Sequence, residues 1–459
     1  MKKGIFQIAI ANIVSLIIGL ITNFVLPAFL SIETYAHIKT YAFYISYAGV
    51  FTLGYCDGMY LRYGGKRLVD INSEEISSDF GNNTFLLILS GSVILLLGLY
   101  RENTVLCFFA IGLVFYDLLG TVRLLCQAVG EYKLYSFSIN CEKLIIFITS
   151  IILLFVFNND NPYVYISAQI LASIIILLLI LFSGFIKKGL LKKIKIYCPT
   201  IKETIREGFI LMIGNLSVGL FTGIDRWFIK LLMTSVQFAY YSYAISMETV
   251  IGLFMSPLTV VMYNYFCLDH EKKEIMKIKR LISIWGFVLI AAAFPAKFIL
   301  MNFIPKYKES ISVLFWLFLA QAFMFVVQGV YVNLYKAKKQ QALYLKQIIE
   351  MIIIAVLTNS VFYIVVKKMD SFAIATAITS IIWFAMCEKK YYIYRFSKRE
   401  LIGIILISII YIMCGYCLNP VTGLIVYSVG GIILLYIFWN DIFMICVDHY
   451  KKLTTYWIK

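Results

Sequence analysis

Charged side chains inside long apolar segments are the residues of this chain that could do chemistry. A charge near the centre of a bilayer costs about 2.5–3.5 kcal/mol on insertion scales, so each one needs a partner or a water-filled cavity. Asp57, Asp117 and Glu248 lie deepest in their segments, and we expect them to face a wet cavity. Arg62 and Arg123 lie near segment ends, where snorkelling to the membrane surface is the simpler interpretation. The alternative for all five is a buried ion pair that holds helices together.

An adjacent acid and base, Asp225 and Arg226, need separate treatment. Neighbouring residues on a helix point about 100° apart, so these two side chains are poorly placed to pair with each other. Each must find another partner, which for the arginine could be an anionic ligand. A planar guanidinium binds two phosphate oxygens at once, which favours a phosphate-bearing ligand. Because Arg226 comes late in its apolar segment, we expect it toward the outer mouth of the protein.

Motifs of enzyme chemistry are missing from the sequence. The three histidines have no metal-like spacing, and there is no P-loop, no dinucleotide-binding glycine motif and no nucleophile elbow. Cys414 and Cys417 form a C-x-x-C, but a redox motif needs a βαβ context that an apolar segment does not offer. The sequence therefore predicts neither an enzyme nor a metal or cofactor site.

The elements that carry these residues are about fourteen apolar stretches, most of them near the ~20 residues that a helix needs to cross a bilayer. The basic residues alternate between the gaps. If Met1 starts in the cytoplasm, 32 of the 41 Lys and Arg residues fall on the cytoplasmic side and 9 on the other. That bias is typical of a polytopic helical membrane protein and predicts that both termini are cytoplasmic.

Composition agrees with a membrane protein. The chain is 61% hydrophobic and 14% charged, with a mean hydropathy of +0.87. A net charge of +16 would suggest nucleic acid in a soluble protein. Here the basic loops face the anionic cytoplasmic leaflet, and no basic face is interleaved with exposed aromatic residues. The composition therefore argues against nucleic acid as a partner.

The expected architecture is all-α and integral to the membrane, with about fourteen transmembrane helices. The expected spans are approximately residues 5–30, 41–61, 84–100, 105–125, 144–157, 164–186, 208–232, 241–266, 281–304, 311–334, 348–366, 371–386, 401–418 and 421–439. Residues 62–79 are expected to be a cytoplasmic loop. No external loop exceeds about a dozen residues, which leaves no room outside the membrane for a catalytic or receptor domain.

A weak internal repeat divides the chain. A shift of 203 residues places Asn12 on Asn215 and Ala36 on Ala239 without a gap. Each unit holds six helices, so both start on the same side, as in a parallel repeat. The predicted domains are 1–186, a basic linker or interfacial helix at 187–207, 208–400, and a final helix pair with its tail at 401–459.

Short motifs around the seventh span resemble a known family. Asp225 and Arg226 lie within Gly223–Ile229, and a tyrosine-rich segment follows at Tyr240–Ala244. Together with Gly214–Leu216, this pattern is similar to the Wzx-type polysaccharide-flippase branch of the MOP exporter superfamily. Further similar stretches are Glu33–Ala36 with Gly54–Arg62, and Ile304–Ser310. One departure concerns the first lobe. Family members often carry more than one basic residue deep in that lobe, whereas the first span of this chain carries none.

The resemblance implies two six-helix lobes in a V around a central cavity, plus the C-terminal helix pair. It implies a flippase that moves undecaprenyl-diphosphate-linked oligosaccharide to the outer face of a bacterial cell membrane by alternating access, for O-antigen, lipopolysaccharide or capsule synthesis. The expected substrate contacts are Arg226, Asp225, Arg62 and Arg123. The residues expected to bind a coupling cation or proton are Asp57, Asp117 and Glu248. The expected state is a monomer among membrane lipids, in contact with polysaccharide polymerase machinery.

Several other functions compete with this expectation. A cation-coupled drug antiporter of the MATE type usually stops at twelve helices, whereas a peptidoglycan-precursor flippase also has fourteen. A membrane glycan polymerase usually needs a large external loop with catalytic bases, which this sequence lacks. A purely structural scaffold does not explain several charges inside the membrane.

Overall fold

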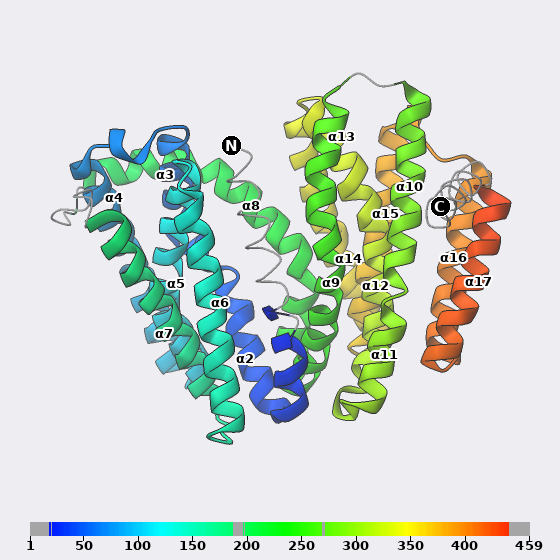
Figure 1. Cartoon of the computed structure of the whole chain (residues 1–459), viewed down its shortest axis with the longest axis horizontal. Helices are drawn as coiled ribbons and strands as arrows, with labels where there is room; N and C mark the ends of the chain where they lie inside the picture. The colour runs from blue at the N-terminus through cyan, green and yellow to red at the C-terminus, as the bar shows by residue number, and fades with distance from the viewer. Residues whose placement is uncertain (1–17, 20, 187–195, 197, 269–270, 440–459) are drawn as a thin grey trace, which may run out of the picture. The chain divides into compact units, whose positions relative to one another are not determined.

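A computed structural model describes residues 18–19, 21–186, 196, 198–268 and 271–439 (Figure 1). Asn12 of the predicted repeat, residues 187–195 and 197 of the predicted basic linker, and the C-terminal tail from residue 440 lie outside these residues. The described part of the chain is helical and contains no strand, and 11 of its helices are long and apolar enough to cross a membrane. The all-helical prediction is confirmed, and the count of fourteen spans stays a prediction.

Two compact units divide the chain, Met1–Leu220 and Phe221–Lys459. The division falls inside one long helix, α8, which runs Cys198–Leu232. The domain boundaries expected from the sequence, at 186, 207 and 400, stay a prediction.

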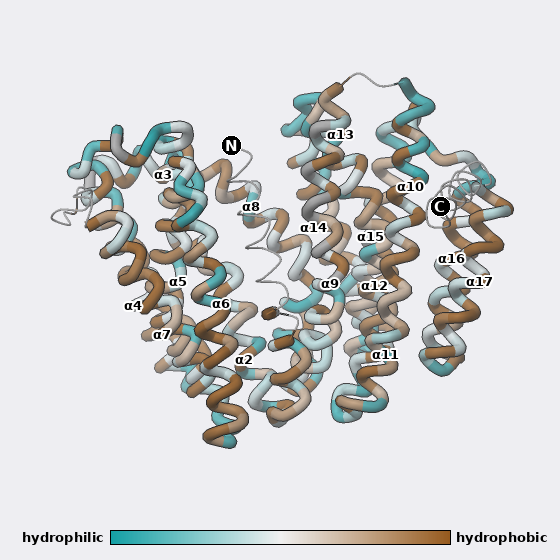
Figure 2. The backbone as a smooth tube through the Cα atoms, viewed as in Figure 1, coloured by the Kyte–Doolittle hydropathy of each residue, from teal (hydrophilic) through white to brown (hydrophobic). Residues whose placement is uncertain are grey.

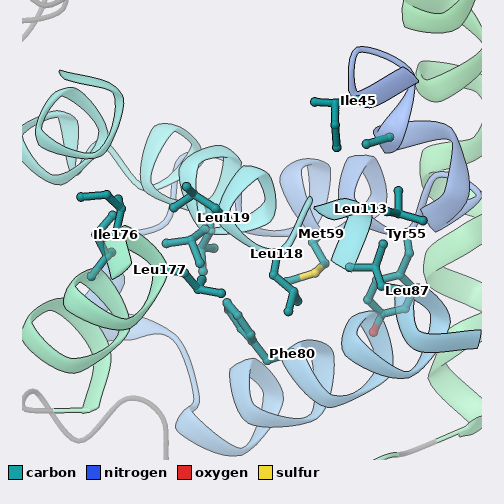
Figure 3. Packing of buried hydrophobic residues seen from close by; sticks show 14 of the residues in the cluster. Ile45, Tyr55, Met59, Phe80, Leu87, Leu113, Leu118, Leu119, Ile176 and Leu177 are labelled. Carbon is teal, nitrogen blue, oxygen red and sulfur yellow. The ribbon is translucent and has the colours of Figure 1, made fainter. Parts of the chain in front are cut away.

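The first unit packs around helix α5. Its elements in chain order are α2 (Ile32–Ile45), η1 (Ala48–Thr52), α3 (Tyr55–Tyr63), η2 (Leu68–Asp70), α4 (Ser73–Tyr100), α5 (Thr104–Ala128), α6 (Tyr132–Phe155), α7 (Pro162–Ile180), η3 (Leu181–Ile186) and the start of α8. Helix α5 contacts α2, α3, α4, α6 and α7. Figure 3 shows Leu113, Leu118 and Leu119 of α5 in this apolar core. The centre of the unit is therefore the helix that carries Asp117 and Arg123.

The second expected span, 41–61, is not one helix, so this prediction was wrong. Helix α2 ends at Ile45, a short 3-10 turn follows, and α3 starts at Tyr55. Leu53 and Gly54 between them have positive φ angles of 54° and 88°. A left-handed pair of residues cannot continue a right-handed helix, and Gly54 adopts that conformation at little cost. The break places Asp57 in the first turn of a new helix.

The expected loop 62–79 also differs from the structure, because α4 begins at Ser73. Asn72 caps this helix, and its side chain accepts a hydrogen bond from the backbone N–H of Glu74. Two acidic residues in the first turn, Glu74 and Glu75, stabilise the helix because their negative charges lie near the positive end of its dipole. The last part of the expected loop, residues 73–79, is thus the start of a helix.

Glycines bring α3 and the first part of α8 into close contact. A Cβ on Gly58 would lie 2.1 Å from the carbonyl oxygen of Thr204, and one on Gly208 would lie 2.1 Å from that of Gly54. Such distances leave no room for a side chain. The first unit therefore holds α8 by backbone-to-backbone packing.

The second unit packs around helix α12. Its elements are the end of α8, α9 (Ser235–Phe266), α10 (Lys272–Ile290), α11 (Ala293–Asn302), η4 (Pro305–Tyr307), α12 (Ser310–Val326), the π-helical turn η5 (Val327–Val332), α13 (Asn333–Ala337), α14 (Gln341–Val366), α15 (Asp370–Lys390), η6 (Tyr392–Tyr394), α16 (Lys398–Cys417) and α17 (Pro420–Phe438). Helix α12 contacts α9, α10, α15 and α16. Figure 2 shows hydrophilic residues gathered at helix ends, such as the start of α10 and the end of α11.

The close contact of α3 with α8 predicts a position-specific effect of adding one methyl group. Gly208→Ala should lower the free energy of unfolding by about 1–3 kcal/mol, because overpacking forces the helices apart. Gly214→Ala is the matched control, since nothing lies within 4 Å of a Cβ at that position of the same helix. Thermal unfolding of the purified protein in detergent measures both. Equal midpoints for the two variants would contradict the packing described here.

Candidate transport cavities

A polar cavity of about 400 Å³ lies within the first unit. Its walls come from the η1 turn and helices α3, α5, α6 and α8. Three of the charged residues expected to be functional line it, Asp57, Asp117 and Arg123. The other polar side chains on its walls are Ser46, Tyr47, Tyr116, Thr121, Gln127, Tyr135 and Asn215.

The two carboxylates of this cavity have neutral hydrogen-bond partners. The side-chain amide of Asn215 on α8 donates to Asp57 at 3.2 Å. Asp117 is 8% exposed, and its Oδ2 lies 4.0 Å from the Cys56 Sγ, which itself contacts the Thr121 hydroxyl at 2.8 Å. Both acids therefore lie on a wall of amides, hydroxyls and a thiol.

Arg123 is bound to its own unit by three hydrogen bonds. Its guanidinium forms an ion pair with Glu142 of α6 at 2.7 Å. It also donates to the carbonyl oxygen of Ser138 at 2.9 Å and to the hydroxyl of that serine at 3.0 Å. Glu142 is buried and accepts a further bond from Ser173 of α7 at 2.6 Å. The arginine thus joins α5 to α6 while one face of it lines the cavity.

Arg62 lies apart from this cavity. Its guanidinium nitrogens lie 3.6 Å from Asp79 and 3.5 Å from Glu207, and it donates to the Thr204 hydroxyl at 2.5 Å. Asp79 is buried and also accepts hydrogen bonds from Tyr55 and Tyr63. The structure places Arg62 in an ion-pair cluster where α3, α4 and α8 meet.

A second polar cavity, of about 350 Å³, lies within the second unit. Helices α8, α9, α12, α14 and α15 form it, together with the η5 turn. The structure brings together here the remaining three expected residues, Asp225, Arg226 and Glu248. The neutral polar residues of its walls are Thr222, Thr249, Gln321, Gln328, Asn359, Thr376, Thr379 and Ser380.

Asp225 and Arg226 point to different partners, as the helix geometry predicts. Asp225 is 4% exposed and accepts hydrogen bonds from the Tyr241 hydroxyl at 2.6 Å and from the Thr376 hydroxyl at 3.4 Å. Its carboxylate also accepts the backbone N–H of Arg226 at 2.7 Å. The guanidinium of Arg226 lies 3.5 Å from the carbonyl oxygen of Thr222 and lines the cavity. The carboxylate thus joins α8 to α9 and α15 next to the arginine.

Glu248 completes the charges of this second cavity. It lies on α9, half-buried, and accepts a hydrogen bond from the side-chain amide of Gln321 on α12. The cavity therefore presents two carboxylates and one guanidinium, surrounded by amides and hydroxyls.

Sequence reasoning missed the neutral residues of both cavities and the partner of Arg123. Asn215, Gln321 and Asn359 carry no charge, so a search for charges inside apolar segments passes over them. Glu142 was missed because the fifth span was expected to start at residue 144, whereas α6 starts at Tyr132. A search for amides on the same helix faces as the acids would have found part of this set.

The fold and sequence both match known proteins. Residues 1–267 match the model of a family described as "Polysaccharide biosynthesis protein". A solved structure titled "Lipid II flippase MurJ, inward closed conformation" is 14% identical, covers 94% of this chain and 98% of its own, and gives a TM-score of 0.68. The structure of an outward-facing MATE multidrug resistance transporter of the MOP superfamily is 13% identical. It covers 86% of this chain and 96% of its own, and gives a TM-score of 0.50. No curated protein matches the sequence significantly.

These matches settle the class of the protein. The matched model covers more than half of the chain, and the all-helical fold is similar to those of the two solved structures. The resemblance noted from the sequence is therefore confirmed. The chain belongs to the polysaccharide biosynthesis protein family, the family of Wzx-type flippases in the MOP superfamily, and is a multi-pass membrane protein.

Proposed function

We propose that the protein moves undecaprenyl-diphosphate-linked oligosaccharide from the cytoplasmic to the outer face of a bacterial cell membrane, by alternating access. The glycan would serve surface polysaccharide synthesis, such as O-antigen or capsule. Both chain termini would be cytoplasmic, and the protein would work as a monomer near the polymerase machinery. The observation that carries the proposal is a polar cavity of several hundred Å³ within each unit of a chain from this family.

Sugars and diphosphates cannot cross hydrocarbon unaided, because their polar groups lose hydrogen bonds to water. The second cavity offers replacements for that water from Gln321, Gln328 and Asn359, in addition to five side-chain hydroxyls. Amides both donate and accept hydrogen bonds, as sugar hydroxyls do. A cavity of about 350 Å³ also lies in the size range of small-molecule sites. The walls suit a glycan better than they suit an apolar drug.

Arg226 is the residue we assign to the diphosphate, because its guanidinium lines the second cavity. Asp225 would hold Arg226 in place, because its carboxylate accepts a hydrogen bond from the backbone N–H of Arg226. Hydrogen bonds from the hydroxyls of Tyr241 and Thr376 fix that carboxylate in turn. Arg62 and Arg123 would be secondary contacts, at which the diphosphate competes with Glu207 and Glu142 respectively. We rank Arg62 and Arg123 below Arg226 as diphosphate contacts because each of these two arginines already forms an ion pair with a carboxylate.

Asp57, Asp117 and Glu248 would bind the coupling cation or proton. Each accepts hydrogen bonds from neutral groups on a cavity wall, so a cation that enters would supply a missing positive charge. A carboxylate in a low-dielectric site binds a proton or a metal cation more readily than one in water. Binding at these acids would then favour one conformation over the other.

A cation-coupled drug antiporter is the second candidate. Each cavity holds two carboxylates and one arginine, an excess of negative charge that suits a cationic substrate. A lipid II flippase is a third, and shares the chemistry of a lipid-linked diphosphate. Glycan location, cell viability and dye sensitivity in a deletion strain separate the three.

Replacing Arg226 tests the assignment of the diphosphate. Arg226→Ala should reduce delivery of the glycan to the outer face about tenfold or more, because charge-assisted hydrogen bonds contribute about 1.5–3 kcal/mol each. In a deletion strain that carries the variant, a membrane-impermeant glycosidase reports which leaflet holds the lipid-linked oligosaccharide. Arg206→Ala is the control, since this arginine is exposed on the same helix. Normal delivery by Arg226→Ala, or an equal loss in the control, would contradict the assignment.

Removing the ion pair of Arg123 separates its structural role from substrate binding. Arg123→Met alone should cost about 3–5 kcal/mol of stability, because Glu142 is left as an uncompensated buried charge. Replacing both residues by Met should recover most of that stability, as thermal unfolding would show. If Arg123 contacts the diphosphate, the double variant should fold but export less glycan. Full export by the stable double variant would reduce Arg123 to a structural residue.

A further inference from the structure

A pocket outside both cavities lies in the second unit, where α11 and η4 meet the start of α12 and the end of α16. Its volume is about 320 Å³. Successive spans run in opposite directions, so the turn between α14 and α15 lies at the same end of this unit as the start of α12. The basic-residue bias of the sequence predicts that this end faces outward. Its lining includes three charged residues, Lys297, Lys308 and Glu309, and three apolar ones, Met301, Ile311 and Phe315.

Lys297 on α11 is the residue that makes this pocket unusual. It is 8% exposed, and its ammonium group donates to the carbonyl oxygens of Gly415 at 2.7 Å and Leu418 at 2.8 Å. No carboxylate of the described residues forms an ion pair with it. An ammonium group has three N–H donors, so one remains after these two bonds. The buried cation therefore has a spare donor and an uncompensated charge.

The C-terminal end of α16 stabilises this charge only in part. Carbonyl groups at a helix end carry a partial negative charge, typically worth less than that of a carboxylate. Gly415 allows the Phe315 ring to pack against the end of α16, since a Cβ at this position would lie 2.4 Å from that ring. That ring lies 5.8 Å from the ammonium nitrogen of Lys297 and adds a weak cation–π contact. The packing thus fixes the lysine at the pocket rather than letting it reach solvent.

The rest of the pocket combines a second cation with an apolar wall. Lys308 is exposed at the rim, and no described residue forms an ion pair or a side-chain hydrogen bond with it. Met301, Ile311 and Phe315 supply apolar surface. Glu309 brings an opposing negative charge, so the two lysines leave a net charge of one. Asp370 binds the Ser312 hydroxyl at 2.6 Å and does not line the pocket.

Position in the chain places this pocket at the depth of lipid headgroups. Lys297 comes five residues before Asn302, the last residue of α11, which corresponds to about 8 Å along the helix axis. The headgroup region of a bilayer is about 5–8 Å thick on each side. A ligand here would meet two ammonium groups at one side and apolar side chains at the other.

We propose that this pocket binds the phosphate group of a membrane lipid in the outer leaflet, with Lys297 and Lys308 as its contacts. The phosphate accepts a hydrogen bond from the third N–H of the Lys297 ammonium group and neutralises its buried charge. The first carbons of the lipid chains lie against Ile311 and Phe315. The site does not depend on the transport function proposed above. Both a phospholipid and the undecaprenyl carrier present the same chemical group.

Binding of defined lipids to the purified full-length protein tests the proposal. Native mass spectrometry with phosphatidylglycerol should show an affinity about tenfold lower for Lys308→Gln than for the wild type, because a charge-assisted contact is lost. Lys297→Gln should show at least the same loss, and Glu309→Gln should bind more tightly. Lys368→Gln is the matched control, since Lys368 is an exposed lysine in the α14–α15 turn at the same end. Size-exclusion elution confirms that each variant is folded.

Competition identifies the source of the phosphate. Displacement of phosphatidylglycerol by undecaprenyl phosphate at lower concentration would assign the pocket to the carrier lipid. Resistance to undecaprenyl phosphate and to inorganic phosphate would assign it to membrane phospholipid. The proposal is overturned if Lys308→Gln and Glu309→Gln bind phosphatidylglycerol as the wild type does, or if Lys368→Gln loses it equally. If Lys297 only held the end of α16 in place, Lys308→Gln and Glu309→Gln would bind phosphatidylglycerol as the wild type does, because neither Lys308 nor Glu309 forms a hydrogen bond or an ion pair with the described residues of that helix end.

Discussion

The high cost of an isolated charge in hydrocarbon governs the arrangement of this protein. The described helices meet it with ion pairs that act as struts. Lys279 of α10 is fully buried and binds Glu388 of α15, which also accepts from Tyr331. Arg280 pairs with Glu400 at the start of α16, 2.6 Å away, and Arg123 pairs with Glu142 in the first unit. These contacts fasten helices that lie far apart in the sequence.

A second group of charges is held differently, and it coincides with the cavities. Asp57, Asp117, Asp225 and Glu248 accept hydrogen bonds from amides, hydroxyls, a thiol or a backbone N–H. Such donors satisfy a carboxylate without neutralising it, which leaves a binding capacity for a cation or a polar ligand. The distinction between paired struts and wall residues without such a pair is the physical basis on which we propose transport chemistry in these two cavities.

Much of the fold follows from local patterns in the sequence, whereas the sites depend on tertiary contacts. Apolar length located α5 and α17 within a few residues, since 105–125 and 421–439 became Thr104–Ala128 and Pro420–Phe438. The broken second span escaped prediction because its left-handed turn is stabilised by contact with α8, which sequence spacing does not reveal. For the same reason the grouping of Asp225, Arg226 and Glu248 was foreseen only as a set of intramembrane charges. Each partner lies on a different helix from the carboxylate that it binds. Tyr241 of α9 and Thr376 of α15 bind Asp225 of α8, and Gln321 of α12 binds Glu248 of α9.

Direct flipping of the lipid-linked glycan by the purified protein is the measurement that tests the central claim. Unilamellar vesicles with and without the reconstituted protein would carry undecaprenyl-diphosphate-linked oligosaccharide, and an added lectin would report the fraction on the outer leaflet over time. We expect exchange between leaflets that is fast with the protein and absent from protein-free vesicles, with slow exchange for Arg226→Ala. Equal rates in protein-containing and protein-free vesicles, with the protein folded, would contradict it.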